Sequence, residues 1–133
     1  MRYVILALIL SACATGRSIP SPLTYSFFDN VDTDSIVITH VNTSDRNQCL
    51  DVESWPDQLG WVDTAPGRVM IVVNGDRYPM RPFNMGYCIG DCQIRVEPNE
   101  QITASMPYSV FDLPPNLYDE NKQLVFDVTT YEC

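Results

Sequence analysis

RVMIVVNG, at residues 68–75, has the pattern of a strand that ends in a tight turn. Residues 68–73 form a short, continuous apolar run rich in β-branched side chains, a composition that favours a strand. Asn74 and Gly75 follow directly, and this pair is typical of a type I′ hairpin turn because both residues tolerate the positive φ angles that the turn requires. We therefore expect residues 76–80 to return antiparallel beside residues 68–73.

The same all-β pattern extends outward through the chain. Alternating aromatic side chains at residues 25–28 favour a first strand over a flexible linker. No stretch has helical periodicity over three turns, and 10 scattered prolines exclude a helix-rich fold. The pattern predicts an immunoglobulin-like two-sheet sandwich, with a small, partly open β-barrel as the alternative. Further strands are expected at residues 35–41, 48–53, 92–96, 101–106 and 123–131.

Length and composition bound the class of protein. The chain has 133 residues, enough for one domain, and 45% hydrophobic residues can form a real core. Its formal net charge is −9, with Lys122 as its single lysine. Because phosphate backbones and anionic lipids attract cationic surfaces, this charge disfavours binding to nucleic acid or to an anionic membrane surface.

The first residues are typical of an export signal. Arg2 precedes an apolar run at residues 3–10 (YVILALIL), which is too short to span a membrane. The run ends in LSAC at residues 10–13, which resembles the lipobox of bacterial lipoproteins. The resemblance covers these residues alone and implies cleavage before Cys13 and attachment of lipid, with acyl chains such as palmitate, to Cys13. An ordinary secretory signal cut near Cys13 is the alternative.

The resemblance also implies a place in the cell. Ala14 stands where an aspartate would resemble the inner-membrane retention signal. We therefore expect a lipid-anchored protein of the bacterial cell envelope, at the outer membrane and facing the periplasm. The expected organisation is a signal peptide at residues 1–12, a lipidated cysteine and tether at residues 13–34 that includes the favoured first strand, and a single sandwich domain at residues 35–133.

Four cysteines remain once Cys13 is assigned to lipid. Export to an oxidising compartment makes them disulfides by default, and four cysteines allow three pairings. We favour Cys88–Cys92, which closes a small loop around Gly90, together with Cys49–Cys133, which ties down the last strand. Pairing of Cys49 with Cys88 or Cys92 stays open as the alternative.

The residues that catalysis or metal binding would require are sparse. His40 is the single histidine and shares a predicted strand face with Ile36 and Ile38, which indicates a hydrogen-bonded structural histidine rather than a general base. The C-x3-C spacing of Cys88 and Cys92 has no second cluster of metal ligands. We expect no catalytic residue, no metal site, no cofactor and no small-molecule substrate.

A loop rich in aromatic residues, methionine and proline is the best candidate for binding. Residues 78–87 contain no acid on a chain that is acidic elsewhere, and rigid aromatics and arginine are enriched in interface hot spots. We expect a non-enzymatic protein-binding or accessory module whose partner is an envelope or secreted protein. The alternative is an inhibitor of a secreted hydrolase, a protease or a lysozyme, that presents this disulfide-braced loop. The expected contact residues are Tyr78, Met80, Arg81, Phe83 and Met85.

Overall fold

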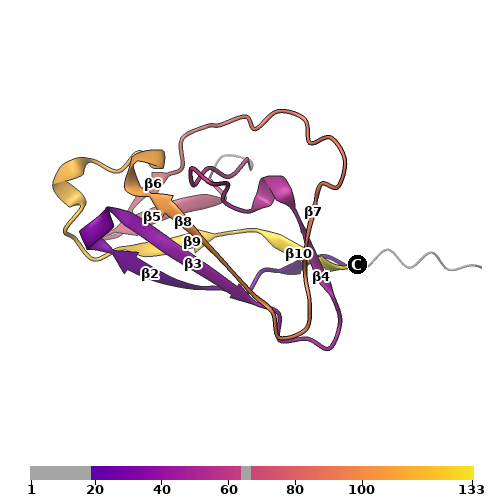
Figure 1. The fold of residues 1–133 in the computed structure, drawn as a ribbon. Helices are drawn as coiled ribbons and strands as arrows, with labels where there is room; N and C mark the ends of the chain where they lie inside the picture. Colours follow the sequence, from indigo (N-terminus) through magenta and orange to yellow (C-terminus); the bar gives the residue numbers. More distant parts are fainter. Residues whose placement is uncertain (1–18, 64–66) are drawn as a thin grey trace, which may run out of the picture.

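A computed structural model describes residues 19–63 and 67–133 (Figure 1). The described residues are dominated by β-strands connected by turns and loops. The strands are β1 (Ser21–Pro22), β2 (Ser26–Asn30), β3 (Ser35–Val41), β4 (Gln48–Asp51), β5 (Val69–Val73), β6 (Asp76–Pro79), β7 (Gln93–Val96), β8 (Gln101–Pro107), β9 (Gln123–Phe126) and β10 (Thr129–Glu132).

The strands form three sheets, and none of them closes into a barrel. The sheet orders are β1-β10-β4-β7, β2-β3-β8 and β6-β5-β9, and every strand pair is antiparallel. In Figure 1 the β2-β3-β8 and β6-β5-β9 sheets lie at one end, and β4, β7 and β10 lie at the other. The predicted all-β sandwich is confirmed.

Single turns of 3-10 helix punctuate the strands. They are η1 (Val31–Thr33), η2 (Val52–Ser54), η3 (Tyr108–Val110) and η4 (Pro115–Leu117). Within residues 19–63 and 67–133, no helix is long and apolar enough to cross a membrane.

The Asn74-Gly75 hairpin has the predicted geometry. Asn74 has φ 51° and Gly75 has φ 86°, so both residues occupy the left-handed region that a type I′ turn requires. Val73 pairs with Asp76 directly across the turn, and Met70 pairs with Pro79 at the other end of the ladder.

One hydrophobic core lies between the sheets. Ile36, Ile38 and His40 alternate inward along β3 and are almost fully buried. The hydroxyl of Tyr25 connects two sheets, because it donates to the Leu124 carbonyl at 2.9 Å and accepts from the Phe126 N–H at 3.1 Å. Tyr25 therefore holds the edge of β9 close to β2 without a backbone ladder between them.

Two of the expected strands end two or more residues early in the structure. Residues 123–131 were expected to form one strand, but the chain leaves β9 at Phe126 and begins β10 at Thr129. Between them, the N–H of Asp127 donates to the Arg68 carbonyl at 2.7 Å, and Val128 is buried. The break lets the chain pair first with β5 and then with β4, which belong to different sheets. Residues 48–53 were likewise expected as one strand, but β4 ends at Asp51 and η2 begins at Val52.

The folded unit begins before the expected boundary at residue 35. Leu23 is buried in the core, β2 pairs along its length with β3, and Ser21 pairs with Thr130. The favoured first strand is thus β2, and most of the expected tether at residues 13–34 belongs to the domain. The predicted signal peptide and Cys13 lie outside the described residues.

Both favoured disulfides are present. Cys49 and Cys133 are bonded across a sequence separation of 84, and Cys88 and Cys92 across a separation of 4. Cys49 pairs with Tyr131 in the ladder between β4 and β10, so its bond to Cys133 ties the last residue of the chain to the sheet.

Candidate protein-binding loop

The loop between β6 and β7, residues 80–92, extends along one side of the molecule (Figure 1). Backbone hydrogen bonds hold both of its ends. At its start, Met80 forms a bridge with Phe111, and the N–H of Arg81 donates to the Val110 carbonyl at 2.8 Å. At its end, the Cys92 carbonyl accepts from the Val52 N–H at 2.9 Å. We call this segment the β6–β7 loop.

Two of the expected contact residues contribute to the fold. Tyr78 lies opposite Ile71 in the hairpin, and Met80 follows at the end of β6. Both side chains are half-buried and pack against the hydrophobic core. Their position leaves only part of each side chain accessible to a partner.

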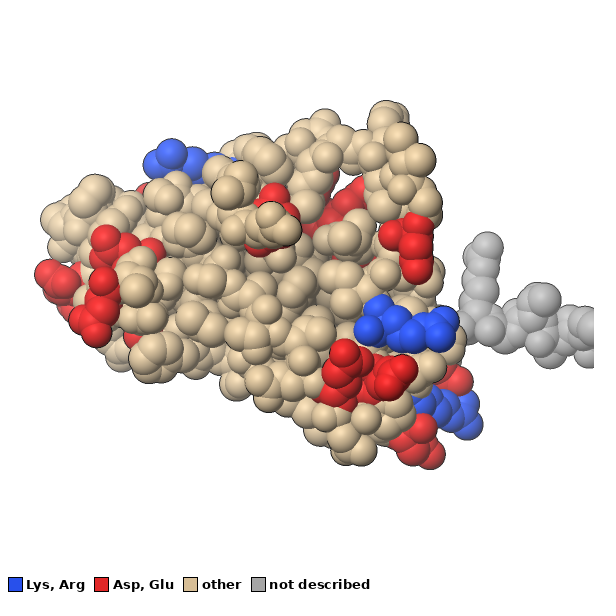
Figure 2. All heavy atoms as spheres, viewed as in Figure 1, with Lys and Arg blue, Asp and Glu red and all other residues tan. Residues whose placement is uncertain are grey.

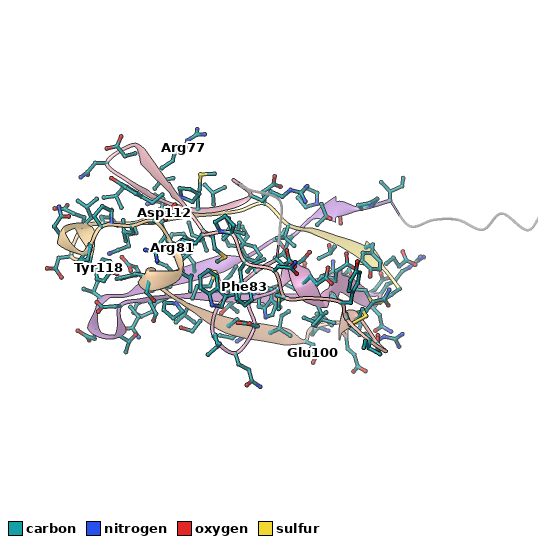
Figure 3. All side chains as sticks on the ribbon, turned by 90° about the horizontal axis from the view of Figure 1, so that it is seen from above. Arg77, Arg81, Phe83, Glu100, Asp112 and Tyr118 are labelled. Atoms are coloured by element: carbon teal, nitrogen blue, oxygen red, sulfur yellow. A yellow bond between two sulfur atoms is a disulfide. The ribbon has the colours of Figure 1, made fainter. Side chains whose placement is uncertain are left out.

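Arg81 forms an ion pair on the surface. Its Nε lies 3.3 Å from Oδ1 of Asp112, and both side chains are 56% exposed. Figure 3 shows Arg81 and Asp112 side by side. Because an exposed pair contributes little to stability, Arg81 can exchange Asp112 for an acidic group of a partner at low cost.

Phe83 and Met85 lie at the centre of the β6–β7 loop. Phe83 stacks on Trp61 with ring centroids 4.7 Å apart and an interplanar angle of 14°, yet it remains 38% exposed. The N–H of Met85 donates to Oδ2 of Asp63 at 3.1 Å, and its side chain is half-buried. These two contacts fix the middle of the loop against residues 61–63.

The most exposed apolar side chains of the loop were not among the expected contact residues. Tyr87 is 99% exposed and Ile89 is 96% exposed, and they flank the disulfide-bonded Cys88. The sequence signal for Ile89 was the small ring that Cys88 and Cys92 close, because its few residues have no core to pack against. Tyr87 directly precedes this ring. We call residues 87–89 the loop tip.

His40 and Trp55 have structural positions. The Nδ1 atom of His40 lies 2.6 Å from the Thr24 carbonyl and its Nε2 atom lies 3.0 Å from Oε1 of Gln48. Trp55 is buried and meets Phe126 edge to face at 6.0 Å. In the part of the chain that the structure describes, no group of three or more His, Cys, Asp or Glu side chains is arranged to hold a metal ion.

Lys122 lies in a buried cluster that the sequence pattern did not indicate. Its Nζ donates to Oδ2 of Asp29 at 3.3 Å and to the carbonyls of Tyr118 and Glu120, and it lies 4.4 Å from the centre of the Tyr108 ring. Tyr108 donates its hydroxyl hydrogen to Asp29. Burial, and then this bond to Asp29, raise the pKa of Tyr108 above its ordinary value.

No protein-family model matches the chain, and searches of curated proteins and of solved structures found no match.

Proposed function

We propose that this protein is a lipoprotein of the bacterial cell envelope that binds another envelope or secreted protein through the β6–β7 loop, without catalysing a reaction. Cys13 carries the lipid and anchors the chain to the outer membrane, facing the periplasm. The observation that carries the binding role is the loop tip, where Tyr87 and Ile89 are almost fully exposed beside a disulfide.

The physical argument is one of exposed area and preorganisation. Burial of large apolar side chains against a partner lowers the free energy of the complex. Tyrosine and isoleucine lose little rotamer entropy when they are buried. The Cys88–Cys92 bond and the hydrogen bond from Val52 to Cys92 limit the conformations of the tip before it binds. A contact segment that is already ordered loses less conformational entropy on association.

The alternative is an inhibitor of a secreted protease or lysozyme. The shape of the tip favours it, because a small disulfide-closed ring with an apolar residue before and after Cys88 suits a concave active-site cleft. The acidic chain, with net charge −9, would accelerate its encounter with a basic lysozyme.

The test is capture from detergent-solubilised envelopes with the wild-type chain and a double variant, Tyr87→Ser with Ile89→Ser. A matched control, Phe28→Ser, removes an aromatic side chain that is 64% exposed on β2, away from the loop. We expect the wild type and Phe28→Ser to retain one stable partner and the double variant to lose it. Equal retention by all three chains would remove the loop tip from the proposal.

The same three chains separate the two candidate functions. Each is added to a basic lysozyme and to a panel of secreted proteases. Inhibition that depends on Tyr87 and Ile89 would replace the accessory role with the inhibitor role, whereas a captured partner without inhibition supports the accessory role.

A further inference from the structure

The loop tip stands away from the body of the protein. In Figure 1 the β6–β7 loop arches outward, and Figure 2, in the same view, shows open space between the arch and the body. Gly86 and Gly90, on either side of the tip, have φ angles of 78° and 104°. A Cβ atom at either position would meet no atom beyond the adjacent residues within 4 Å. Among the described residues, nothing therefore packs around these glycines to hold the tip in place.

Hydrogen bonds do not hold the tip either. In the part of the chain that the structure describes, residues 86–91 form hydrogen bonds only with residues two positions away in sequence. The hydrogen bonds to the body of the protein begin on either side of this segment, at Met85 and at Cys92. Between these two points, the Cys88–Cys92 disulfide is the restraint that orders the chain.

The fold shields the other disulfide from an attacking thiol. Cys49 is only 1% exposed, and its strand β4 lies between β10 and β7. Cys88 and Cys92 are both half-exposed. Thiol–disulfide exchange begins when a thiolate reaches one of the two sulfur atoms. A reductant therefore attacks the Cys88–Cys92 bond more readily than the Cys49–Cys133 bond.

The fold also favours closure of the longer bridge once it has opened. Tyr131 pairs with Cys49 in the ladder between β4 and β10, and the N–H of Cys133 donates to the Asn47 carbonyl at 3.4 Å. These contacts keep the two thiols at a high effective concentration, which favours their reoxidation. No ladder of the described residues joins Cys88 to Cys92, so their thiols separate more freely after reduction.

We infer that the Cys88–Cys92 bond is a redox switch, which orders the loop tip when oxidised and releases it when a dithiol protein reduces the bond. A thiolate of the dithiol attacks one sulfur of the bond, forms a mixed disulfide and expels the other sulfur as a thiolate, which takes up a proton. The second thiol of the reductant then resolves the mixed disulfide. The reductant becomes a disulfide, and the two electrons and two protons that it loses convert Cys88 and Cys92 to thiols.

The consequence for binding rests on the proposed function of the β6–β7 loop. Tyr87 and Ile89 lie on either side of Cys88 and are the most exposed apolar side chains of the loop. Reduction gives their backbone more conformational freedom, and a partner must remove that freedom again on association. Reduction is therefore expected to weaken binding while leaving the sheets folded.

Chemical labelling tests the reduction step without a partner. The full chain carries Cys13→Ser, so that its four remaining cysteines are those in the two disulfides. It is treated with graded dithiothreitol in the absence of denaturant, free thiols are blocked with iodoacetamide, and labelled peptides are identified by mass spectrometry. We expect the Cys88–Cys92 pair to be labelled at a dithiothreitol concentration at least about tenfold lower than the Cys49–Cys133 pair. Labelling of both pairs together, or of neither before the chain unfolds, would overturn the inference.

Hydrogen exchange and envelope capture test the effect on the loop tip. We compare the oxidised chain with the selectively reduced chain, and use Cys88→Ser with Cys92→Ser as a control that lacks the bond. We expect faster amide exchange at residues 86–91 and weaker capture after reduction, with both reversed by reoxidation. The control is expected to resemble the reduced chain with or without dithiothreitol.

Unchanged exchange at residues 86–91 after reduction would overturn the inference. Equal capture of one partner by the oxidised and the reduced chains would also overturn it. Selective reduction with faster exchange, but with no partner captured in either state, would support the switch and contradict the proposed function.

Discussion

Lys122 shows how one side chain can control the stability of a region. Its side chain is fully buried, whereas that of its carboxylate partner Asp29 is 18% exposed. The ammonium group has three donors, and Asp29 and the carbonyls of Tyr118 and Glu120 accept from it. Lys122 thereby fixes the turn before β9 to the end of β2.

Replacement of Lys122 by methionine is expected to lower the free energy of unfolding by about 3–5 kcal/mol, because it leaves the carboxylate of Asp29 without its cation in a largely buried site. Urea unfolding measures the change. The exposed Arg77→Met serves as the control and is expected to leave stability within about 0.5 kcal/mol of the wild type. A loss below about 1 kcal/mol for Lys122→Met would mean that the cluster does not stabilise the fold.

Tyr108 gives the stability of the protein a dependence on alkaline pH. Its pKa is raised in the folded state by burial and by its bond to Asp29, so the folded chain keeps the phenolic proton at pH values where the unfolded chain has lost it. The stabilisation is fully present below the unfolded pKa of 10.0 and is lost as the pH rises through the folded pKa.

We therefore expect the free energy of unfolding to fall as the pH increases above about 10, the ordinary tyrosine pKa, and to fall less steeply in Tyr108→Phe. Denaturant titrations between neutral and alkaline pH test this. Tyr87→Phe, which alters an almost fully exposed ring, is the matched control and should follow the wild-type profile. Identical slopes for the wild type and Tyr108→Phe would refute the assignment.

Among the elements, the two disulfides close loops of very different size. In the chain-entropy model, the Cys49–Cys133 bond stabilises the fold by about 4.5 kcal/mol and the Cys88–Cys92 bond by about 2 kcal/mol. The first is anchored in the sheet at the almost fully buried Cys49, and the second lies in the β6–β7 loop with both cysteines half-exposed.

The paired variants Cys49→Ser with Cys133→Ser are expected to lower the melting temperature much more than Cys88→Ser with Cys92→Ser. The second pair is instead expected to weaken partner capture, because the loop tip loses its constraint. Thermal unfolding and the envelope capture assay provide the two measurements. The prediction fails if loss of the short bridge destabilises the fold as much as loss of the long one.

For the molecule as a whole, the proposed lipidation of Cys13 would decide where the protein works. Two or three acyl chains, at about 0.8 kcal/mol for each buried methylene, hold a protein on a membrane essentially permanently, whereas one chain does so only marginally. Cys13→Ser is expected to abolish incorporation of labelled palmitate and to release the chain from the membrane fraction. Membrane association of Cys13→Ser together with an unlabelled wild type would exclude the lipoprotein assignment.

Local sequence patterns predicted most elements of the fold. Contacts between near neighbours and backbone preferences can be read directly from a sequence. They determine the apolar run at residues 69–73, the Asn74-Gly75 turn and the alternation of β3. Similar reasoning favoured the cysteine pairing. Cys88 and Cys92 can close a small loop around Gly90, and a bond from Cys49 to Cys133 keeps the last strand from fraying. The disulfides of the structure confirm it.

Long-range geometry decided the rest. No local pattern marks the break at Asp127 and Val128, because it arises from the separate positions of β5 and β4. Residues 78–87 have the composition of an interface, but the sheet beneath them buries part of Tyr78 and Met80, and Trp61 supports Phe83. The exposure of Tyr87 and Ile89 and the burial of Lys122 likewise depend on which segments the fold brings together. A sequence specifies the chemistry of each side chain, whereas the packing of distant segments decides which of them water can reach.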